Sequence, residues 1–204
     1  MSKMITVVTN KVAVPAAFFN VARLMILLIL PAAGCVSTPS TEYFTLDMRS
    51  SGPVEVLPVK LDIQRFRPAE ALTRDGILIQ ASPTRVEYYA TAEWAADLAE
   101  LVPRKLATEL DNAPQDAPTL EVTGTILDFG QVDKDGDAEA RARLTLEFRE
   151  PGSSRYDTPL FKKTYHAQVP ASPPDPAGVV KALSRALERI ALEIAHDVRQ
   201  HFPR

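Results

Sequence analysis

The stretch "AEARARLTLEFRE", Ala138–Glu150, decides the predicted fold, because apolar and polar side chains alternate along it. Its clearest apolar positions are Ala142, Leu144, Leu146 and Phe148. Arginine, threonine and glutamate residues occupy the positions between them. A period of two residues is typical of a β-strand that buries one face and exposes the other. The stretch therefore predicts a strand with one face in the core and one face in water.

The segment before this strand predicts its partner. A second strand-like run, "TLEVTGTILDFGQV", is joined to it by "DKDGD", Asp133–Asp137, and Asp-Gly between two such runs is a hairpin turn signal. The acidic residues also resemble a calcium loop, which needs glycine at its sixth position and glutamate at its twelfth. Those positions hold Ala138 and Leu144, so the sequence favours the hairpin turn.

Further strands and two helices complete the predicted domain. Shorter strand-like runs occupy residues 41–47, 54–63, 77–82, 84–90 and 159–169. Apolar residues recur at helical spacing over Thr91–Leu110, with Thr91 as the predicted N-cap, and again over residues 177–200. We therefore expect an α+β fold, in which an antiparallel sheet of about five to six strands carries two long helices on one face.

The first 34 residues have the composition of a signal peptide. They contain basic residues but no acidic one, and the apolar run "LMILLIL" is followed by "PAAG". A basic start, a short apolar run and small residues before a cleavage point are typical of secretory signals. An uncleaved spanning helix is the alternative, but it needs roughly 20 apolar residues. A span of that length would include Asn20 and Arg23, which are costly in lipid.

Cys35, the only cysteine, directly follows these small residues. A lone thiol excludes an internal disulfide and a zinc site made of several thiolates. The position resembles the bacterial lipobox, in which the signal is cut before a cysteine that then carries acyl chains, and two or more chains give stable anchoring. We expect a lipoprotein signal at 1–34, a lipidated tether at 35–41 and a single α+β domain at 42–204. A secreted protein with an incidental cysteine is the alternative.

Composition and motifs narrow the function further. The net charge of −3 provides no general basic face for nucleic acid. Three histidines, at positions 166, 196 and 201, are too scattered to predict a metal site. The chain has no Gly-x-Ser-x-Gly, His-Glu-x-x-His or P-loop motif. We therefore predict no catalytic residue, no metal and no cofactor apart from the covalent lipid on Cys35.

The segment "RVEYYATAEW" concentrates three aromatic side chains, Tyr88, Tyr89 and Trp94. Alternation along a strand sends Tyr88 and Tyr89 to opposite faces. One interpretation is a core anchor at a strand–helix corner, since aromatic residues dominate cores. The other is a partner interface, since tyrosine and tryptophan are enriched at protein contacts. The three residues are our candidate partner interface.

Four segments resemble the ABC-type transport auxiliary lipoproteins, the family that includes the paraquat-inducible-protein C type. "EYFTLD" resembles the opening strand of that family, and "VLPVKLDIQRF" resembles a Val-x-x-Pro-Val strand. "ILIQASPTRVEYYATAEWAADLAELVPRKLATEL" resembles its most distinctive block, an aromatic strand followed by tryptophan and a leucine-rich helix. "VVKALSRALERIALEIAHDV" resembles its closing helix. Together the segments span nearly the whole predicted mature chain.

The resemblance implies a non-enzymatic component of a lipid-trafficking system. Its partners would be an MCE-type membrane protein and ABC transporter components. It would sit on the inner leaflet of the outer membrane, facing the periplasm, as a docking piece or homo-oligomeric portal for phospholipid or other hydrophobic molecules. A lipoprotein assembly factor for lipopolysaccharide or other outer-membrane components would share the anchor and fold class. A periplasmic hydrolase is a third hypothesis, which needs a nucleophile and a nearby base.

Overall fold

The structure, a computed structural model, describes residues 39–203 apart from 50–54, 135 and 155. The predicted signal peptide and the predicted lipidation site, Cys35, lie outside the described residues. Residues Ser40–Arg204 form one compact unit, to which every contact below belongs. Within the described ranges, no helix combines the length and the apolar character needed to cross a membrane.

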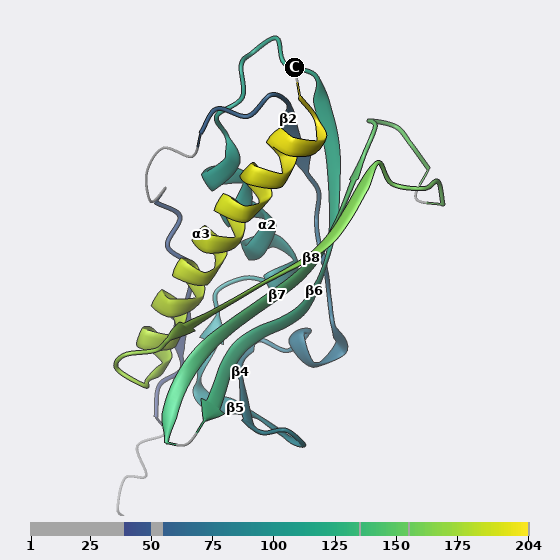
Figure 1. The fold of residues 1–204 in the computed structure, drawn as a ribbon. Helices are drawn as coiled ribbons and strands as arrows, with labels where there is room; N and C mark the ends of the chain where they lie inside the picture. Colours follow the sequence, from purple (N-terminus) through teal and green to yellow (C-terminus); the bar gives the residue numbers. More distant parts are fainter. Residues whose placement is uncertain (1–38, 50–54, 135, 155, 204) are drawn as a thin grey trace, which may run out of the picture. The chain divides into compact units, whose positions relative to one another are not determined.

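The predicted hairpin is confirmed as the longest strand pair of the fold. Strand β6 (Thr119–Lys134) and strand β7 (Asp137–Arg149) pair antiparallel from Glu121 opposite Arg149 to Lys134 opposite Asp137. The turn between them contains Gly136 at φ +93°, a conformation that favours glycine and suits a two-residue hairpin loop. Strand β8 (Phe161–Pro170) continues the antiparallel meander beside β7 (Figure 1).

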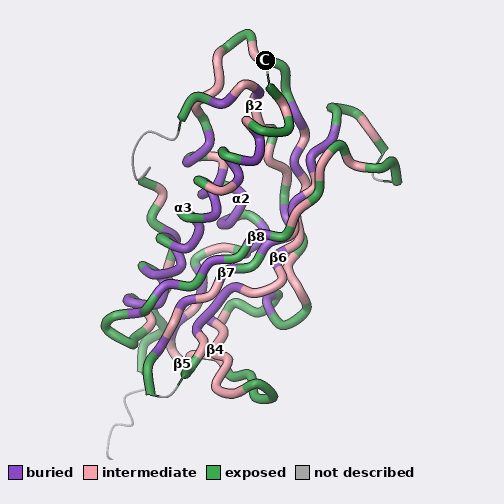
Figure 2. The backbone as a smooth tube through the Cα atoms, in the orientation of Figure 1, coloured by how far each residue is buried: buried purple, intermediate pink, exposed green. Residues whose placement is uncertain are grey.

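The core lies between these strands and helix α3 (Pro176–His201). The apolar positions of the β7 alternation are buried, as predicted. One stripe of α3 is buried against them, namely Val179, Leu183, Ala186, Leu187, Ile190, Ile194 and Val198. Figure 2 shows buried positions along the facing sides of α3 and the long strands. The helix begins after Asp175, whose side chain accepts a hydrogen bond from the Gly178 N–H at 2.7 Å and so caps the first turn.

The sheet has eight strands rather than the predicted five to six, and it is mixed rather than purely antiparallel. Its continuous order is β1-β5-β4-β6-β7-β8, and β2 and β3 pair with β6. The remaining strands are β1 (Glu42–Phe44), β2 (Lys60–Ile63), β3 (Arg67–Pro68), β4 (Gly76–Ser82) and β5 (Arg85–Trp94). Strand β1 pairs parallel with β5, and β2, β3 and β4 each pair parallel with β6. These parallel partners are distant in sequence, so no local pattern indicated them.

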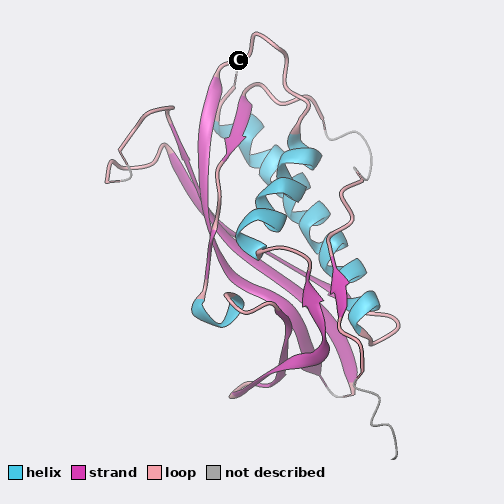
Figure 3. Cartoon of the chain, turned by 180° about the vertical axis from the view of Figure 1, so that it is seen from behind, coloured by secondary structure: helices cyan, strands magenta, loops and turns pink. Residues whose placement is uncertain are grey.

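The first predicted helix is shorter than expected, because helix α2 spans Leu98–Leu110. The predicted N-cap at Thr91 is wrong, since this residue lies inside β5 and Asp97 precedes the helix instead. The strand continues there because β1 pairs with residues 92–94 on one side, and on the other side the Trp94 N–H donates to the Asp75 carbonyl at 2.7 Å. Figures 1 and 3 show α2 and α3 together on one side of the long strands, as predicted.

A buried polar cluster joins the two helices to the segment after β1. Lys105 of α2 is fully buried, and its ammonium group donates to Glu109 at 2.5 Å, to Glu188 of α3 at 3.3 Å and to the Arg49 carbonyl at 2.9 Å. A buried charge needs such compensation, because leaving it unpaired is strongly destabilising.

The segment after β1 is also fastened to α3 directly. The Asp47 N–H donates to the Ser184 hydroxyl at 3.0 Å, and the neighbouring Leu46 side chain is buried in the core. The beginning of the described domain is therefore held by both helices.

Candidate functional site

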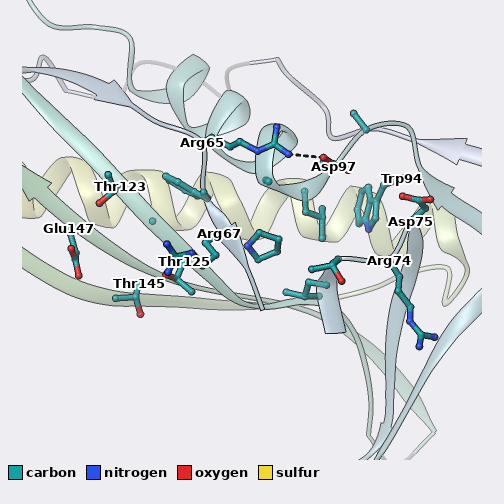
Figure 4. A pocket seen from close by; sticks show the side chains of 18 of the residues that line it. Arg65, Arg67, Arg74, Asp75, Trp94, Asp97, Thr123, Thr125, Thr145 and Glu147 are labelled. Atoms are coloured by element: carbon teal, nitrogen blue, oxygen red, sulfur yellow. Dashed lines mark hydrogen bonds and ion pairs between the residues drawn. The ribbon is translucent and has the colours of Figure 1, made fainter. Parts of the chain in front are cut away.

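A cavity of about 760 Å³ lies where β3 and the short 3-10 helix η1 (Glu70–Leu72) approach the start of α2. We call it the β3–α2 pocket. It is lined by residues 65–68, 72–75, 96–99 and 123–125, together with Trp94, Thr145, Glu147 and Lys162. The side chains labelled in Figure 4 come from β3, β5, β6 and β7 and from the segments next to them. Its lining is part polar and part apolar.

One wall of the pocket depends on a glycine in the middle of β6. Phe66 is 3% exposed, and its backbone N–H donates to the Ala99 carbonyl at 3.1 Å. A Cβ atom on Gly124 would lie 2.7 Å from two ring carbons of Phe66 and 2.8 Å from Leu146 Cδ2. Carbon atoms normally approach to about 3.5–4.0 Å. Only glycine therefore lets the Phe66 ring settle on the strand at this position.

Ion pairs neutralise one part of the pocket's charge. Arg65 donates to Asp97 at 2.7 Å and to Glu100, and the hydrogen bond to Asp97 is the main reason that the pKa of Arg65 is raised. Lys162 and Arg149 each approach Glu147 at 2.7 Å.

Lys162 and Arg149 together change the pKa of Glu147, which lies between them. The hydrogen bond from Lys162, followed by that from Arg149, lowers the pKa of Glu147, although partial burial opposes the shift. Glu147 is therefore held ionised at the edge of the pocket.

The predicted aromatic residues reach different places. Trp94 is 5% exposed, packs 5.7 Å from the Phe129 ring between centroids and lines the β3–α2 pocket. Tyr88 is half-buried, and its hydroxyl donates to the Ala71 carbonyl at 2.7 Å while the Arg74 guanidinium lies 4.9 Å above its ring.

Tyr89 is also half-buried, and its hydroxyl donates to Gln131. Burial raises the pKa of Tyr89 above its ordinary value. Trp94 and Arg74, whose guanidinium lies above the Tyr88 ring, thus both line the β3–α2 pocket, whereas Tyr89 does not. Whether the three aromatic residues contact a partner stays a prediction.

Sequence reasoning missed Phe66, Arg67 and Gly124 as pocket residues. An isolated glycine within a strand pattern often marks the close approach of another group, so Gly124 was the available signal. It also missed the most exposed aromatic residues, Tyr43 at 68% and Tyr156 at 82%.

The three histidines lie apart from this pocket. The His201 ring stacks on Phe161 at 4.0 Å between centroids, His196 faces Gln200 at 3.0 Å, and His166 is on β8. Across the residues that the structure describes, no three histidine, cysteine or acidic side chains gather where they could hold a metal ion.

The mixed sheet with two helices on one side is a known class of fold. It is similar to the crystal structure of a Xanthomonas campestris protein of the DUF330 family, with a TM-score of 0.62 and 16% identity over 77% of this chain and 95% of that one. It is also similar to the crystal structure of an uncharacterized protein, with a TM-score of 0.57 and 15% identity over 78% of this chain and 99% of that one. No curated protein matches the chain.

The family follows from the sequence match rather than from these structures. A family model described as "ABC-type transport auxiliary lipoprotein component" matches residues 45–195. The chain belongs to this family, as its four segments predicted. The family is one of auxiliary components of transport systems, and its description names a lipoprotein.

Proposed function

We propose that the chain is an outer-membrane-anchored periplasmic lipoprotein that serves an MCE/ABC-type lipid transport system as a docking or portal component. The match to the transport auxiliary family over residues 45–195 is the observation that carries the proposal. The absence of catalytic motifs agrees with an auxiliary rather than an enzymatic role.

The anchor on Cys35 is the first part of this proposal. Strand β1 begins at Glu42, so a short polar segment separates the lipid from the folded domain. Such a tether keeps the domain close to the bilayer. Val36, which follows the cysteine, resembles the residue found in outer-membrane-sorted lipoproteins.

Metabolic labelling with radioactive palmitate, followed by separation of inner and outer membranes, tests the anchor. The wild-type chain should carry label in the outer-membrane fraction, and Cys35→Ala should carry none. A wild-type chain without label would remove the anchor, and label in the inner-membrane fraction would correct the location.

Affinity capture from detergent-solubilised envelopes tests the transport role. We expect an MCE-type protein and ABC transporter components among the captured proteins, and we expect the purified chain to form homo-oligomers by native mass spectrometry. Capture of neither class of partner, combined with a monomeric chain, would overturn the docking and portal roles.

Substitution of an aromatic residue in the affinity-capture experiment tests whether β5 faces the partner. Tyr88→Ala removes a half-buried ring on β5, whereas Tyr156→Ala removes an exposed ring on the distant β7–β8 loop. If β5 faces the partner, only Tyr88→Ala should reduce capture by about tenfold, a typical effect of removing an interface tyrosine. Equal capture by both variants would exclude Tyr88 from the interface.

A further inference from the structure

The β3–α2 pocket contains a hydrogen-bond donor that the fold leaves without a partner. Trp94 is 5% exposed, yet its indole N–H has no acceptor among the described residues. Among the described residues, Tyr165 Oη is the one fully enclosed side-chain polar atom without a partner, so the indole nitrogen is not fully enclosed, and the Trp94 side chain lines the cavity. Figure 4 shows the ring with its nitrogen turned toward the side of Arg74. A donor held in this way is available to a ligand.

A second available group lies on the other side of the pocket. Arg67 is exposed, stands opposite Thr125 in the β3–β6 register and has no ion pair or hydrogen bond from its side chain within the described ranges. The neighbouring cations Arg65 and Lys162 are already paired with carboxylates. A free guanidinium offers several donors in a plane that suits a carboxylate or phosphate group.

The two sides of the pocket differ in charge. Figure 4 places Asp75 next to Trp94, on the side away from Arg67. An anion is favoured beside Arg67. Beside Trp94 the Asp75 carboxylate opposes a second anion, while the Arg74 guanidinium on that side lies over the Tyr88 ring, so a neutral carbonyl is the better acceptor for the indole N–H. The apolar side chains of Pro68 and Leu72 line the pocket as well.

We propose that the β3–α2 pocket binds a small organic anion with three parts. A carboxylate or phosphate group pairs with Arg67, an apolar span covers Pro68 and Leu72, and a neutral carbonyl accepts the Trp94 N–H. The volume of about 760 Å³ favours a small molecule, because such sites measure roughly 300–1,000 Å³. A protein partner would need a larger contact, of about 1,200–2,000 Å² in total. This binding activity does not depend on the proposed docking role.

Monomethyl esters of linear dicarboxylic acids test the proposal, since each has one carboxylate, a methylene span and one ester carbonyl. The full chain is purified from its host membranes and reconstituted into phosphatidylcholine vesicles. Trp94 is the only tryptophan, so its fluorescence reports on the pocket directly. The monoesters should change the emission saturably. The matching dimethyl esters, which lack the charge, and the matching diacids, which place a second charge near Asp75, should bind at least about tenfold more weakly.

Three variants assign the contacts. Arg67→Gln should weaken monoester binding by about tenfold or more, as expected for a hydrogen bond to a charged group. Trp94→Phe, followed by ligand-observed NMR because it removes the fluorophore, should weaken it about three- to tenfold. Arg143→Gln is the matched control, because this arginine pairs with Asp128 at 2.6 Å outside the pocket and should leave binding unchanged.

Several results would overturn the proposal. One is the absence of saturable binding by any monoester. Another is an equal loss in Arg67→Gln and Arg143→Gln, which would indicate nonspecific charge attraction. A third is binding of acetate or inorganic phosphate as tight as that of the longest monoester, which would indicate an anion contact without an apolar span. Arg67 is exposed, so Arg67→Gln should keep the wild-type melting temperature, and the binding comparison remains decisive even if Trp94→Phe is unstable.

Discussion

Replacing Gly124 with alanine tests how the wall of the β3–α2 pocket is packed. The added methyl group would lie 2.7 Å from Phe66 Cδ1 and Cε1 and 2.8 Å from Leu146 Cδ2. These approaches are far inside the usual carbon contact of about 3.5–4.0 Å. Without an obstacle, glycine to alanine in a strand would stabilise the protein by roughly 0.5–1 kcal/mol. Overpacking instead costs about 1–3 kcal/mol, so we expect Gly124→Ala to lower the free energy of unfolding by that amount.

A double-mutant cycle with Phe66→Leu identifies the obstacle. The smaller leucine leaves room for the new methyl group, so the two losses should fall short of additivity by about 1 kcal/mol or more. Urea denaturation followed by circular dichroism provides the free energies. A loss of 1 kcal/mol should lower the melting temperature by about 2–4 °C in a chain of this size.

Two outcomes would contradict this reasoning. A neutral or stabilising Gly124→Ala would mean that the Phe66 ring moves aside freely, and additive losses would mean that Phe66 is not the obstacle. Gly76→Ala is the matched control, because its Cβ would approach the nearest atom, Tyr88 Cβ, only to 3.2 Å and should cost less.

Four further predictions follow from buried or constrained groups. Lys105→Met should cost about 3–5 kcal/mol in urea denaturation, because it removes the buried ammonium group to which Glu109, Glu188 and the Arg49 carbonyl are hydrogen-bonded, and a loss below 1 kcal/mol would contradict this. Tyr165→Phe should be neutral or stabilising, since the buried hydroxyl accepts or donates no hydrogen bond within the described part of the chain. Burial raises the pKa of Tyr165, so the wild type should lose stability as the pH rises above about 10, and Tyr165→Phe should lose less over that range. Glu147→Gln should reduce the fall in melting temperature at acid pH. The lowered pKa of Glu147 stabilises the wild type above about pH 4.3, and this stabilisation is lost as the pH falls through that value and then through the pKa in the folded state. Gly136→Ala should cost about 1–2 kcal/mol at φ +93°, and an unchanged melting temperature would show that the turn adapts.

Local periodicity explains which elements the sequence predicted. The β6–β7 hairpin and helix α3 each carry a continuous pattern with a single period, and their observed bounds lie within a few residues of the predicted ones. The alternation in β7 also identified its buried face correctly, because a strand with one wet face has only one register that buries its apolar residues.

The error in the predicted start of α2 shows where local patterns fail. The spacing of Trp94 and Leu98 fits a helical face, but Trp94 belongs to β5 and Leu98 is the first residue of α2. The strand is extended by β1, whose three residues pair with 92–94. A partner some 50 residues away in the chain leaves no periodic signal in either segment, so the tertiary contact overrides the local preference.

The candidate site was even less accessible from the sequence. Phe66, Trp94 and Gly124 come from three separate parts of the chain and meet only after β3 pairs with β6. The sequence identified Trp94 as important without indicating its neighbours. Gly124 was visible as an irregularity in an otherwise regular strand, but a missing side chain does not show which group fills the space.

The parallel pairing of β1 has a mechanical consequence. A force on Glu42 directed along the strand acts across the hydrogen bonds to β5, so the three paired residues resist it together instead of separating one after another. The segment that follows passes the remaining load to α3 through Ser184 and to α2 through Lys105. If the chain is anchored through Cys35 as proposed, a pull on the domain away from the membrane would load β1 in the direction in which this attachment is strongest.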